Sequence, residues 1–444
     1  MIALIAGPDR LPRFAQGLGL PYLAAVLEEA GYEAKIFDRY LSPGDTTDTA
    51  VLDEHLAEAI AREQPLIVGM TIHTPDYAKR VRLAAYLRER LPQTLLVAGG
   101  HHPSAEPEQL LRDTVFDVCV IGEGEETLLE IAQRIARGEG SGSGHWLQDV
   151  PGVAYKHQGQ VVRTPPRPPP ADIDALPHPA HHLLGLEDYS PHPVLGIKST
   201  ALLTYRGCPK SCAFCLNPQG RRIRRRSPSN VVDEMARVVD EYEVRGFNVY
   251  DNLFGLDRKH AAAVCEEIQT RRLDVVWDCW TAGDVIGEEL ANKMRASGCI
   301  YVGFGAESGD DEVLARAHRG FTSAQHQAGI HALSAAGLKP RVYFMIGLPG
   351  ESEESVRQTV EFAKRCGADE VVLSVYRPYP GTAIWQKPEA FGTRITRGPN
   401  FEAYIETSHL SRTALLECTQ WAVDELKRCG LKVDILRYDR YEWE

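Results

Sequence analysis

The sequence predicts an α/β protein in which an N-terminal doubly wound parallel sheet is followed by a partial, parallel (β/α)6 barrel and a small C-terminal domain. Two observations support this prediction. Short apolar runs typical of buried strands alternate with helical patterns, first over residues 1–140 and again over 196–385. Such alternation is typical of parallel sheets. Between the two series, residues 141–195 are rich in glycine, serine and proline and interrupt the alternation, which indicates a linker.

The first series is interpreted as strands separated by helices. The apolar runs MIALIAG, EAKIFD, LIVGMTI, TLLVAGG and FDVCVIG alternate with helical segments such as LGLPYLAAVLEEAGY and DYAKRVRLAAYLRERL. Doubly wound sheets bind their ligands beyond the carboxyl ends of the strands. In this chain those ends carry Gly7, residues 71–73, Gly99–Gly100 and Gly122–Gly124.

The elements of the linker and of the second series are also predicted from sequence patterns. The pattern GVAYKHQGQVVR predicts a hairpin over residues 152–163, followed by a proline-rich crossover. Six strand-like runs then occur, namely STALLTYRG, GFNVYDN, DVVWDCW, CIYVGFGAES, KPRVYFMIG and EVVLSVYRP. Strand–helix units of about 30 residues favour a barrel over another open sheet. Residues 386–444 are left for the small C-terminal domain, with one amphipathic helix, RTALLECTQWAVDELKRCG.

Composition narrows the class of protein. The chain has 444 residues, of which 43% are hydrophobic and 25% charged, so it is long enough for two or three domains with real cores. It has no run of eighteen apolar residues, and its first residues lack the basic segment of a secretory signal. Its ten cysteines are mostly scattered, which argues against a disulfide framework and for a reducing cytoplasm. The net charge of −12 disfavours nucleic acid or membrane as the main partner.

The segment RGCPKSCAFC places Cys208, Cys212 and Cys215 just after the first predicted barrel strand. Closely spaced thiolates are soft ligands, and the candidates are zinc, a redox pair or an iron–sulfur cluster. Structural zinc needs a fourth Cys or His at ligand spacing, and none follows in LNPQGRRIRRRSPSN. A redox pair would leave Cys208 unused. The remaining option is a cubane cluster held by three cysteines, which leaves one iron open for a further ligand.

This segment resembles the Cys-x3-Cys-x-aromatic-Cys signature of radical S-adenosylmethionine enzymes. The resemblance implies that the three cysteines hold a 4Fe–4S cluster whose fourth iron takes the amino and carboxylate groups of S-adenosylmethionine. Phe214 occupies the aromatic position, whose backbone meets the adenine. Agreement with the family runs from about residue 200 to residue 385.

Later segments resemble further motifs of the family, in order: VYDNLFG, GFGAESGD, FMIGLPGES and YRPYPGT. The cofactor contacts that they imply are Asp251 and Asn252 near the methionine amino group, Glu307 and Ser308 at the fourth strand, and Gly347 near the adenine. One departure is Gly283 in WTAGDV, where relatives usually carry an arginine. The resemblance therefore implies that one polar contact near the site is missing.

The N-terminal series resembles the Rossmann-like cobalamin-binding domain that precedes the barrel in one large subgroup of the family. The segments concerned are LGLPYLAAVLEEAGYEAKIFD, VGMTIHTPDY, AGGHHPSAEPEQLL and VIGEGEETLLEI. Bound cobalamin would place its nucleotide tail near Gly99 and Gly100, with the loop that carries His73 on the lower side of the cobalt. The motif Asp-x-His-x-x-Gly is absent, so no histidine from that motif reaches the cobalt. Because such turns need glycines for the backbone alone, an empty domain stays open as the alternative.

The resemblance implies that the cluster cleaves S-adenosylmethionine to a 5′-deoxyadenosyl radical, which takes hydrogen from a natural-product or sugar-like small molecule. The favoured reaction is cobalamin-dependent C-methyl transfer. The alternative is cobalamin-independent dehydration of a diol in an aminoglycoside-type substrate, as in antibiotic biosynthesis. A non-enzymatic electron carrier would leave Asp251 and Glu307 without a role. A flavodoxin- or ferredoxin-type protein is the expected reductant.

Overall fold

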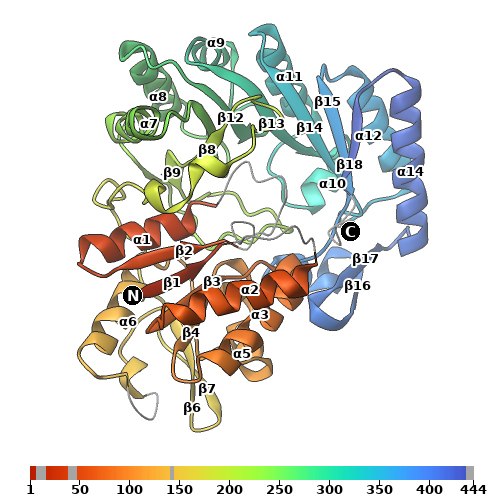
Figure 1. Ribbon diagram of the computed structural model, residues 1–444. Helices are drawn as coiled ribbons and strands as arrows, with labels where there is room; N and C mark the ends of the chain where they lie inside the picture. The colour runs from red at the N-terminus through yellow and green to blue at the C-terminus, as the bar shows by residue number, and fades with distance from the viewer. Residues whose placement is uncertain (7–16, 39–47, 141–144, 437–444) are drawn as a thin grey trace. The chain divides into compact units, whose positions relative to one another are not determined.

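The computed structural model describes residues 1–6, 17–38, 48–140 and 145–436. The chain forms two compact units that divide between Tyr189 and Ser190. Gly7, predicted at the end of the first strand, lies outside the described residues, as do four residues of the predicted linker. Figure 1 labels the helices and strands.

The first unit contains a seven-stranded sheet in the order β2-β1-β3-β4-β5-β6-β7 (Figure 1). Its strands are β1 (Ile2–Ile5), β2 (Ala34–Phe37), β3 (Ile67–Thr71), β4 (Leu95–Gly99), β5 (Val118–Val120), β6 (Val153–His157) and β7 (Gln160–Arg163). Strands β1 to β5 pair in parallel, and the order reverses at β1, so the predicted doubly wound parallel sheet is confirmed. The hairpin predicted over residues 152–163 is formed, and it adds β6 and β7 as antiparallel strands at one edge.

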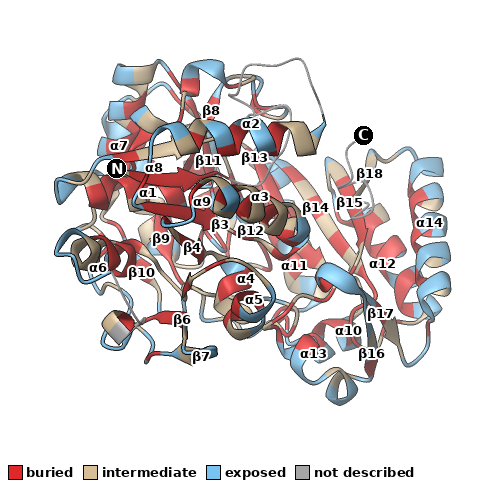
Figure 2. Cartoon of the chain, turned by 60° about the horizontal axis from the view of Figure 1, so that its bottom comes forward, coloured by how far each residue is buried: buried red, intermediate tan, exposed pale blue. Residues whose placement is uncertain are grey.

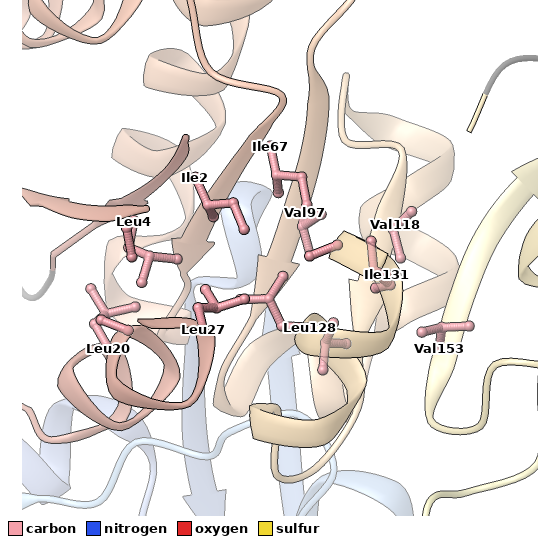
Figure 3. Packing of buried hydrophobic residues seen from close by; sticks show 14 of the residues in the cluster. Ile2, Leu4, Leu20, Leu27, Ile67, Val97, Val118, Leu128, Ile131 and Val153 are labelled. Carbon is pink, nitrogen blue, oxygen red and sulfur yellow. The ribbon is translucent and has the colours of Figure 1, made fainter. Parts of the chain in front are cut away.

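Helices connect these strands. They are α1 (Gly19–Glu29), α2 (Thr49–Arg62), α3 (Tyr77–Arg90), α4 (His101–Ala105), α5 (Pro107–Asp113) and α6 (Glu125–Ala136), with the 3-10 turns η2 (Thr74–Asp76) and η3 (His145–Leu147). Figure 3 shows Leu20 and Leu27 of α1 and Leu128 and Ile131 of α6 packed against inward-facing strand residues. Each such side chain contributes about 1.5–3 kcal/mol when fully buried, so this face anchors both helices to the sheet.

The proline-rich segment after β7 also packs on the first unit. Arg167 donates to the hydroxyl of Thr127 at 2.8 Å and forms an ion pair with Glu130, both on α6. The backbone N–H of Ala180 donates to the carbonyl of Pro21. Two 3-10 turns, η4 (His181–Leu183) and η5 (Leu186–Asp188), follow. The crossover is therefore tied to the sheet by side chains and backbone.

The second unit contains a seven-stranded parallel sheet in the order β18-β15-β14-β13-β12-β11-β8. Its strands are β8 (Ser199–Leu202), β11 (Gly246–Val249), β12 (Val276–Thr281), β13 (Cys299–Glu307), β14 (Lys339–Ile346), β15 (Glu370–Val375) and β18 (Val433–Leu436). The strands β8 to β15 of this sheet are those of the predicted partial (β/α)6 barrel, which is confirmed. The sequence did not predict β18, which extends the sheet beside β15.

The helices of this unit are α7 (Pro228–Tyr242), α8 (Arg258–Thr270), α9 (Glu288–Ala296), α10 (Asp311–Arg316), α11 (Ser323–Ala335), α12 (Glu353–Arg365), α13 (Ala383–Gln386) and α14 (Arg412–Arg428). Several begin at a side-chain cap, as at Ser227, Thr322 and Ser352, which satisfies backbone donors of the first turn. The shorter elements are β9 (Tyr205–Arg206), β10 (Arg224–Arg225), β16 (Thr393–Arg397), β17 (Ala403–Thr407), η6 (Pro388–Phe391) and η7 (Pro399–Phe401).

The two faces of the barrel strands differ in burial. Along β12, Trp277 and Cys279 are buried, whereas Asp278 is half-buried and Trp280 exposed. Figure 2 shows the buried residues concentrated in the strands and the helix faces toward them. One strand face is therefore core, and the other is partly open to a ligand. None of the helices within the described ranges is long and apolar enough to cross a membrane.

Candidate active site

A cavity of about 510 Å³ lies at the carboxyl ends of the strands of the second unit. The three cysteines of the predicted cluster motif, Cys208, Cys212 and Cys215, all line it. The residues at the ends of β12, β13 and β14 also reach it. This position is where parallel barrels gather their chemistry.

The loop that carries the cysteines is held on both sides. Strands β9 and β10 form a two-stranded antiparallel pair, and the N–H of Cys208 donates to the carbonyl of Gly220 at 3.0 Å. The N–H of Ala213 donates to the carbonyl of Ala317, and the carbonyl of Ala213 accepts from the N–H of Ile384. The spacing of the thiols is therefore set by backbone hydrogen bonds to neighbouring segments.

The donor set fits an iron–sulfur cluster. The three thiols are free, Cys208 and Cys212 are partly exposed, and Cys215 is exposed. Within the described residues, no three His, Cys, Asp or Glu side chains are grouped around one metal-ion position. A cubane cluster does not need such a group, because each thiolate binds a different iron. Three soft thiolates on one loop that faces a cavity are the donors that such a cluster takes.

Arg319, which the sequence did not single out, lies between the cysteines and Glu307. Its Nη1 is 3.7 Å from the Sγ of Cys212, and its Nη2 donates to the carbonyl of Gly305 at 2.6 Å. The distance from its Nη2 to the Oε1 of Glu307 is 3.6 Å. Burial raises the pKa of the Cys212 thiol, and the Arg319 guanidinium opposes that rise. The arginine therefore favours the thiolate form that a cluster requires.

Glu307 ends β13 with a φ of 70°, in the left-handed region. Its carboxylate lines the cavity and is only 13% exposed. Burial raises the pKa of this carboxyl, and Arg319 opposes the rise. A non-glycine residue in this conformation costs on the order of 1–3 kcal/mol, which the surrounding strand must offset. The carboxylate is thereby aimed at the cavity, where the sequence predicted it.

The departure at Gly283 has a steric cause. A Cβ at this position would lie 2.2 Å from the ring of Phe321, so an arginine here would displace that ring. Phe321 in turn lies under Lys210, whose Nζ is 3.7 Å from the ring centroid. The cavity instead receives an arginine, Arg319, from the loop between α10 and α11.

The two residues predicted after β11 differ in position. Asn252 lines the cavity and donates to the Oε1 of Gln219 at 3.2 Å. Asp251 does not belong to the lining; it is 3% exposed. Its carboxylate accepts from the N–H and the hydroxyl of Thr204 at 2.8 and 2.5 Å, and from the N–H of Tyr205 at 3.3 Å. Asp251 therefore holds the backbone at Thr204 and Tyr205, just before the cysteine loop, and does not line the cavity.

Phe214 lines the cavity, but Ser308 and Gly347 lie outside its lining. The hydroxyl of Ser308 is fully buried and contacts the hydroxyl of Thr359 on α12 at 3.2 Å. The N–H of Gly347 donates to the buried carboxyl group of Glu351 at 3.4 Å. Both residues shape the turns that follow β13 and β14.

An aromatic pair forms another part of the cavity that the sequence did not predict. The rings of Trp280 on β12 and Tyr343 on β14 have centroids 4.6 Å apart, and both residues line the cavity. Alternation along the strands could have placed Trp280 on the inner face. No sequence signal pairs it with Tyr343.

In the first unit, the residues predicted for cobalamin lie at the carboxyl ends of β3 and β4. The rings of His73 and His101 have centroids 5.1 Å apart. A Cβ at Gly99 would meet no atom within 4 Å, whereas a Cβ at Gly100 would lie 3.1 Å from Thr71. Open space beside Gly99 fits a group that needs room at the strand ends. Gly100, with a φ of 99°, is glycine for backbone reasons.

Two known families match different parts of this chain. Residues 202–363 match the radical SAM superfamily, and residues 12–132 match the B12 binding domain. These matches confirm both resemblances found in the sequence.

Individual relatives cover most of the chain. An uncharacterized methyltransferase of Pyrococcus horikoshii is 31% identical over 83% of this chain and 77% of the relative. The anaerobic magnesium-protoporphyrin IX monomethyl ester cyclase of Rubrivivax gelatinosus is 30% identical over 82% of this chain and 65% of the relative. The solved structure of the radical S-adenosylmethionine methyltransferase TsrM from Kitasatospora setae, with cobalamin and a [4Fe-4S] cluster bound, has a TM-score of 0.77 at 20% identity. It covers 96% of this chain and 90% of its own. At that identity the likeness shows the shared fold.

Proposed function

This chain belongs to the radical SAM superfamily and carries a B12-binding domain ahead of its radical SAM domain, and on that premise we propose that it transfers a methyl group to a carbon of a small molecule. The observation that carries the proposal is one cavity lined by the three motif cysteines, by Arg319 and Glu307, and by an aromatic pair. The methyltransferase among its relatives favours this reaction over dehydration of a diol.

Each of the two units would hold one of the protein-bound cofactors. The cysteine loop would hold a 4Fe–4S cluster through Cys208, Cys212 and Cys215, and the strand ends near His73 and Gly99 would hold cobalamin. When bound, the cluster supplies the electron that cleaves S-adenosylmethionine, and cobalamin carries the methyl group. We further propose that the enzyme works in a reducing cytoplasm, where a flavodoxin- or ferredoxin-type protein reduces the cluster.

Arg319 is suited to hold the anionic end of S-adenosylmethionine. Its Nε makes no hydrogen bond within the described residues, although it is buried, and its Nη1 already reaches Cys212. A carboxylate placed beside the cluster would satisfy this donor with a charge-assisted hydrogen bond. Glu307 and Asn252, which line the same cavity, offer acceptors for the amino or hydroxyl groups of the cofactor.

The test is anaerobic reconstitution with iron, sulfide and hydroxocobalamin, followed by removal of unbound cofactor. We expect about one cobalamin retained per chain. With S-adenosylmethionine and a reductant, we expect both 5′-deoxyadenosine and S-adenosylhomocysteine, because a methyltransferase of this kind uses the cofactor in both ways. A wild-type protein that retains no cobalamin and yields only 5′-deoxyadenosine would overturn methyl transfer.

A further inference from the structure

We propose that the substrate of this enzyme carries a flat ring, and that this ring binds against Trp280 and Tyr343 inside the barrel. This inference rests on the proposed function, because it assigns the substrate of the same cavity. It concerns the part of the cavity lining that strands β12 and β14 supply.

Trp280 is an aromatic side chain that the fold leaves uncovered. It is 39% exposed although it lies within a strand of the central sheet. The neighbouring Trp277 is only 2% exposed and donates from its indole N–H to the carbonyl of Ser297, so Trp277 fills the core. Trp280 has no such structural role, and its ring faces the cavity.

A glycine on the strand between them sets the orientation of this ring. Gly303 on β13 pairs with Trp280, and a Cβ at Gly303 would lie 2.7 Å from two atoms of the indole. The indole therefore lies directly over the backbone of β13, and any side chain at position 303 would lift it. Tyr343 packs against the indole at an interplanar angle of 44°, and the part of Trp280 that stays exposed is available to a ligand.

The cavity has both charged and apolar lining residues. Its charged residues, Lys210, Arg221, Glu307 and Arg319, come from the cysteine loop and its surroundings. The other lining residues near the aromatic pair include Leu253, Met345 and Leu436, with Ser374 as a polar neighbour. Charges also lie beside the aromatic pair, because Asp278 precedes Trp280 by two residues on the same face of β12 and Arg341 is 5.5 Å from the centroid of the Tyr343 ring. The two rings, and not the charge of the surroundings, therefore define the kind of ligand. Aromatic surfaces prefer other flat rings, since offset stacking adds to area burial.

The adenine of S-adenosylmethionine is also a flat ring, and the experiment must separate the two. Enzyme loaded with the cluster and cobalamin and saturated with S-adenosylmethionine is titrated with 2-naphthol and, separately, with decahydro-2-naphthol. These probes share a ring skeleton and one hydroxyl group, and only the first is flat. We expect 2-naphthol to bind at least fivefold more tightly, without raising the apparent Kd of S-adenosylmethionine.

Variants test whether 2-naphthol binds at Trp280. Trp280→Ala should weaken 2-naphthol binding at least fivefold and remove the preference over the saturated probe, whereas Trp280→Phe should keep most of it. Gly303→Ala should weaken binding in the same direction by displacing the indole. Trp421→Ala is the matched control, because Trp421 is 41% exposed on α14, and it should change nothing.

Equal affinity for both probes, or unchanged 2-naphthol binding in Trp280→Ala, would overturn the inference. Competition between 2-naphthol and S-adenosylmethionine would also overturn it, because the surface would then belong to the adenine. Cluster content and S-adenosylhomocysteine formation are measured on the same samples. If methyl transfer is absent while the flat probe still binds selectively at Trp280, the proposed function fails and the ring site stands.

Discussion

At residue 319, a guanidinium group lies between the thiol of Cys212 and the carboxylate of Glu307. Its sequence context does not distinguish it from Arg316, three residues earlier, which forms an exposed ion pair with Glu312. The side chains separate only because the loop after α10 turns one of them into the cavity. Spacing rules locate a motif, but they do not report which loop residue the fold directs inward.

For Arg319→Gln we expect S-adenosylmethionine to bind at least tenfold more weakly. A hydrogen bond to a charged group contributes about 1.5–3 kcal/mol, and about 1.4 kcal/mol is a factor of ten. Equilibrium dialysis of the anaerobic, cluster-loaded protein measures the affinity. Arg316→Gln is the matched control and should bind normally. Equal affinity in both variants would remove Arg319 from the cofactor site.

Each of Cys208→Ala, Cys212→Ala and Cys215→Ala should abolish the 4Fe–4S absorption and EPR signals and all formation of 5′-deoxyadenosine. With two thiolates the cluster loses one of its three protein ligands and its open iron is no longer defined. Cys418→Ala, at a partly exposed position on α14, should leave both readouts intact. Full cluster content with only two of the three cysteines would contradict the assignment.

Asp251 is predicted from the sequence to contact the cofactor, but its hydrogen bonds assign it a supporting role. Asp251→Ala leaves the buried N–H and hydroxyl of Thr204 without their acceptor. We therefore expect the free energy of unfolding to fall by about 2–4 kcal/mol, measured by urea titration. Asp251→Asn should recover part of the loss, because its amide oxygen still accepts. A tenfold loss of S-adenosylmethionine affinity at unchanged stability would instead support direct contact.

Among the elements, those with long apolar runs could be predicted and those without could not. The strands β8 to β15 of the barrel sheet follow from such runs, because both faces of a central parallel strand are largely covered. Strand β18 has the sequence VDIL, in which Asp434 pairs with Arg341 of β14 at 2.9 Å. A short edge strand with a charge directed at a partner on another strand carries no recognisable apolar pattern. The packing that defines it is not local.

The turn between β14 and α12 makes a prediction about pH. Burial raises the pKa of Glu351 to about 7, while hydrogen bonds from Ser355 and Gly347 oppose the rise. The native state then keeps a proton on Glu351 between about pH 4.5 and pH 7 that the unfolded chain releases, so the contribution of Glu351 to stability falls as pH rises through this window. Burial also raises the pKa of Asp251 and of Asp278 to about 6, in the same direction.

The measurement is urea unfolding at pH 5, 6 and 7 for the wild type and Glu351→Gln. Relative to the variant, the wild type should lose about 2 kcal/mol across the range, because only the wild type carries the Glu351 carboxyl. The difference between the two proteins is the readout, since burial lowers the pKa of His102 and His192 to about 4 and that of His326 to about 3, which acts in the opposite direction in both proteins. Parallel pH profiles for the two proteins would show that Glu351 is ionised throughout.

For the whole molecule, the order of the two units and the family could be predicted from motifs, whereas the residues that face each cofactor could not. Gly99 and Gly100 are adjacent in sequence and equivalent in any motif. Only Gly99 has open space at its Cβ position, while Gly100 is packed against Thr71 and Ile72. A substitution at position 100 would therefore disturb the strand ends whether or not cobalamin binds there.

Position 99 consequently gives the sharper test of cobalamin binding. Gly99→Leu should fold normally, since a Cβ at this position would meet no atom within 4 Å, but it should lose retained cobalamin by filling the space at the end of β4. Gly287→Leu is the control: its Cβ position is equally open, and it lies in the second unit at the start of α9. Wild type and control should retain hydroxocobalamin with a base-off absorption spectrum, because the chain lacks the Asp-x-His-x-x-Gly motif. Full retention by Gly99→Leu would place the cofactor elsewhere, and a spectrum with nitrogen coordination that disappears in His73→Ala would identify His73 as the lower ligand.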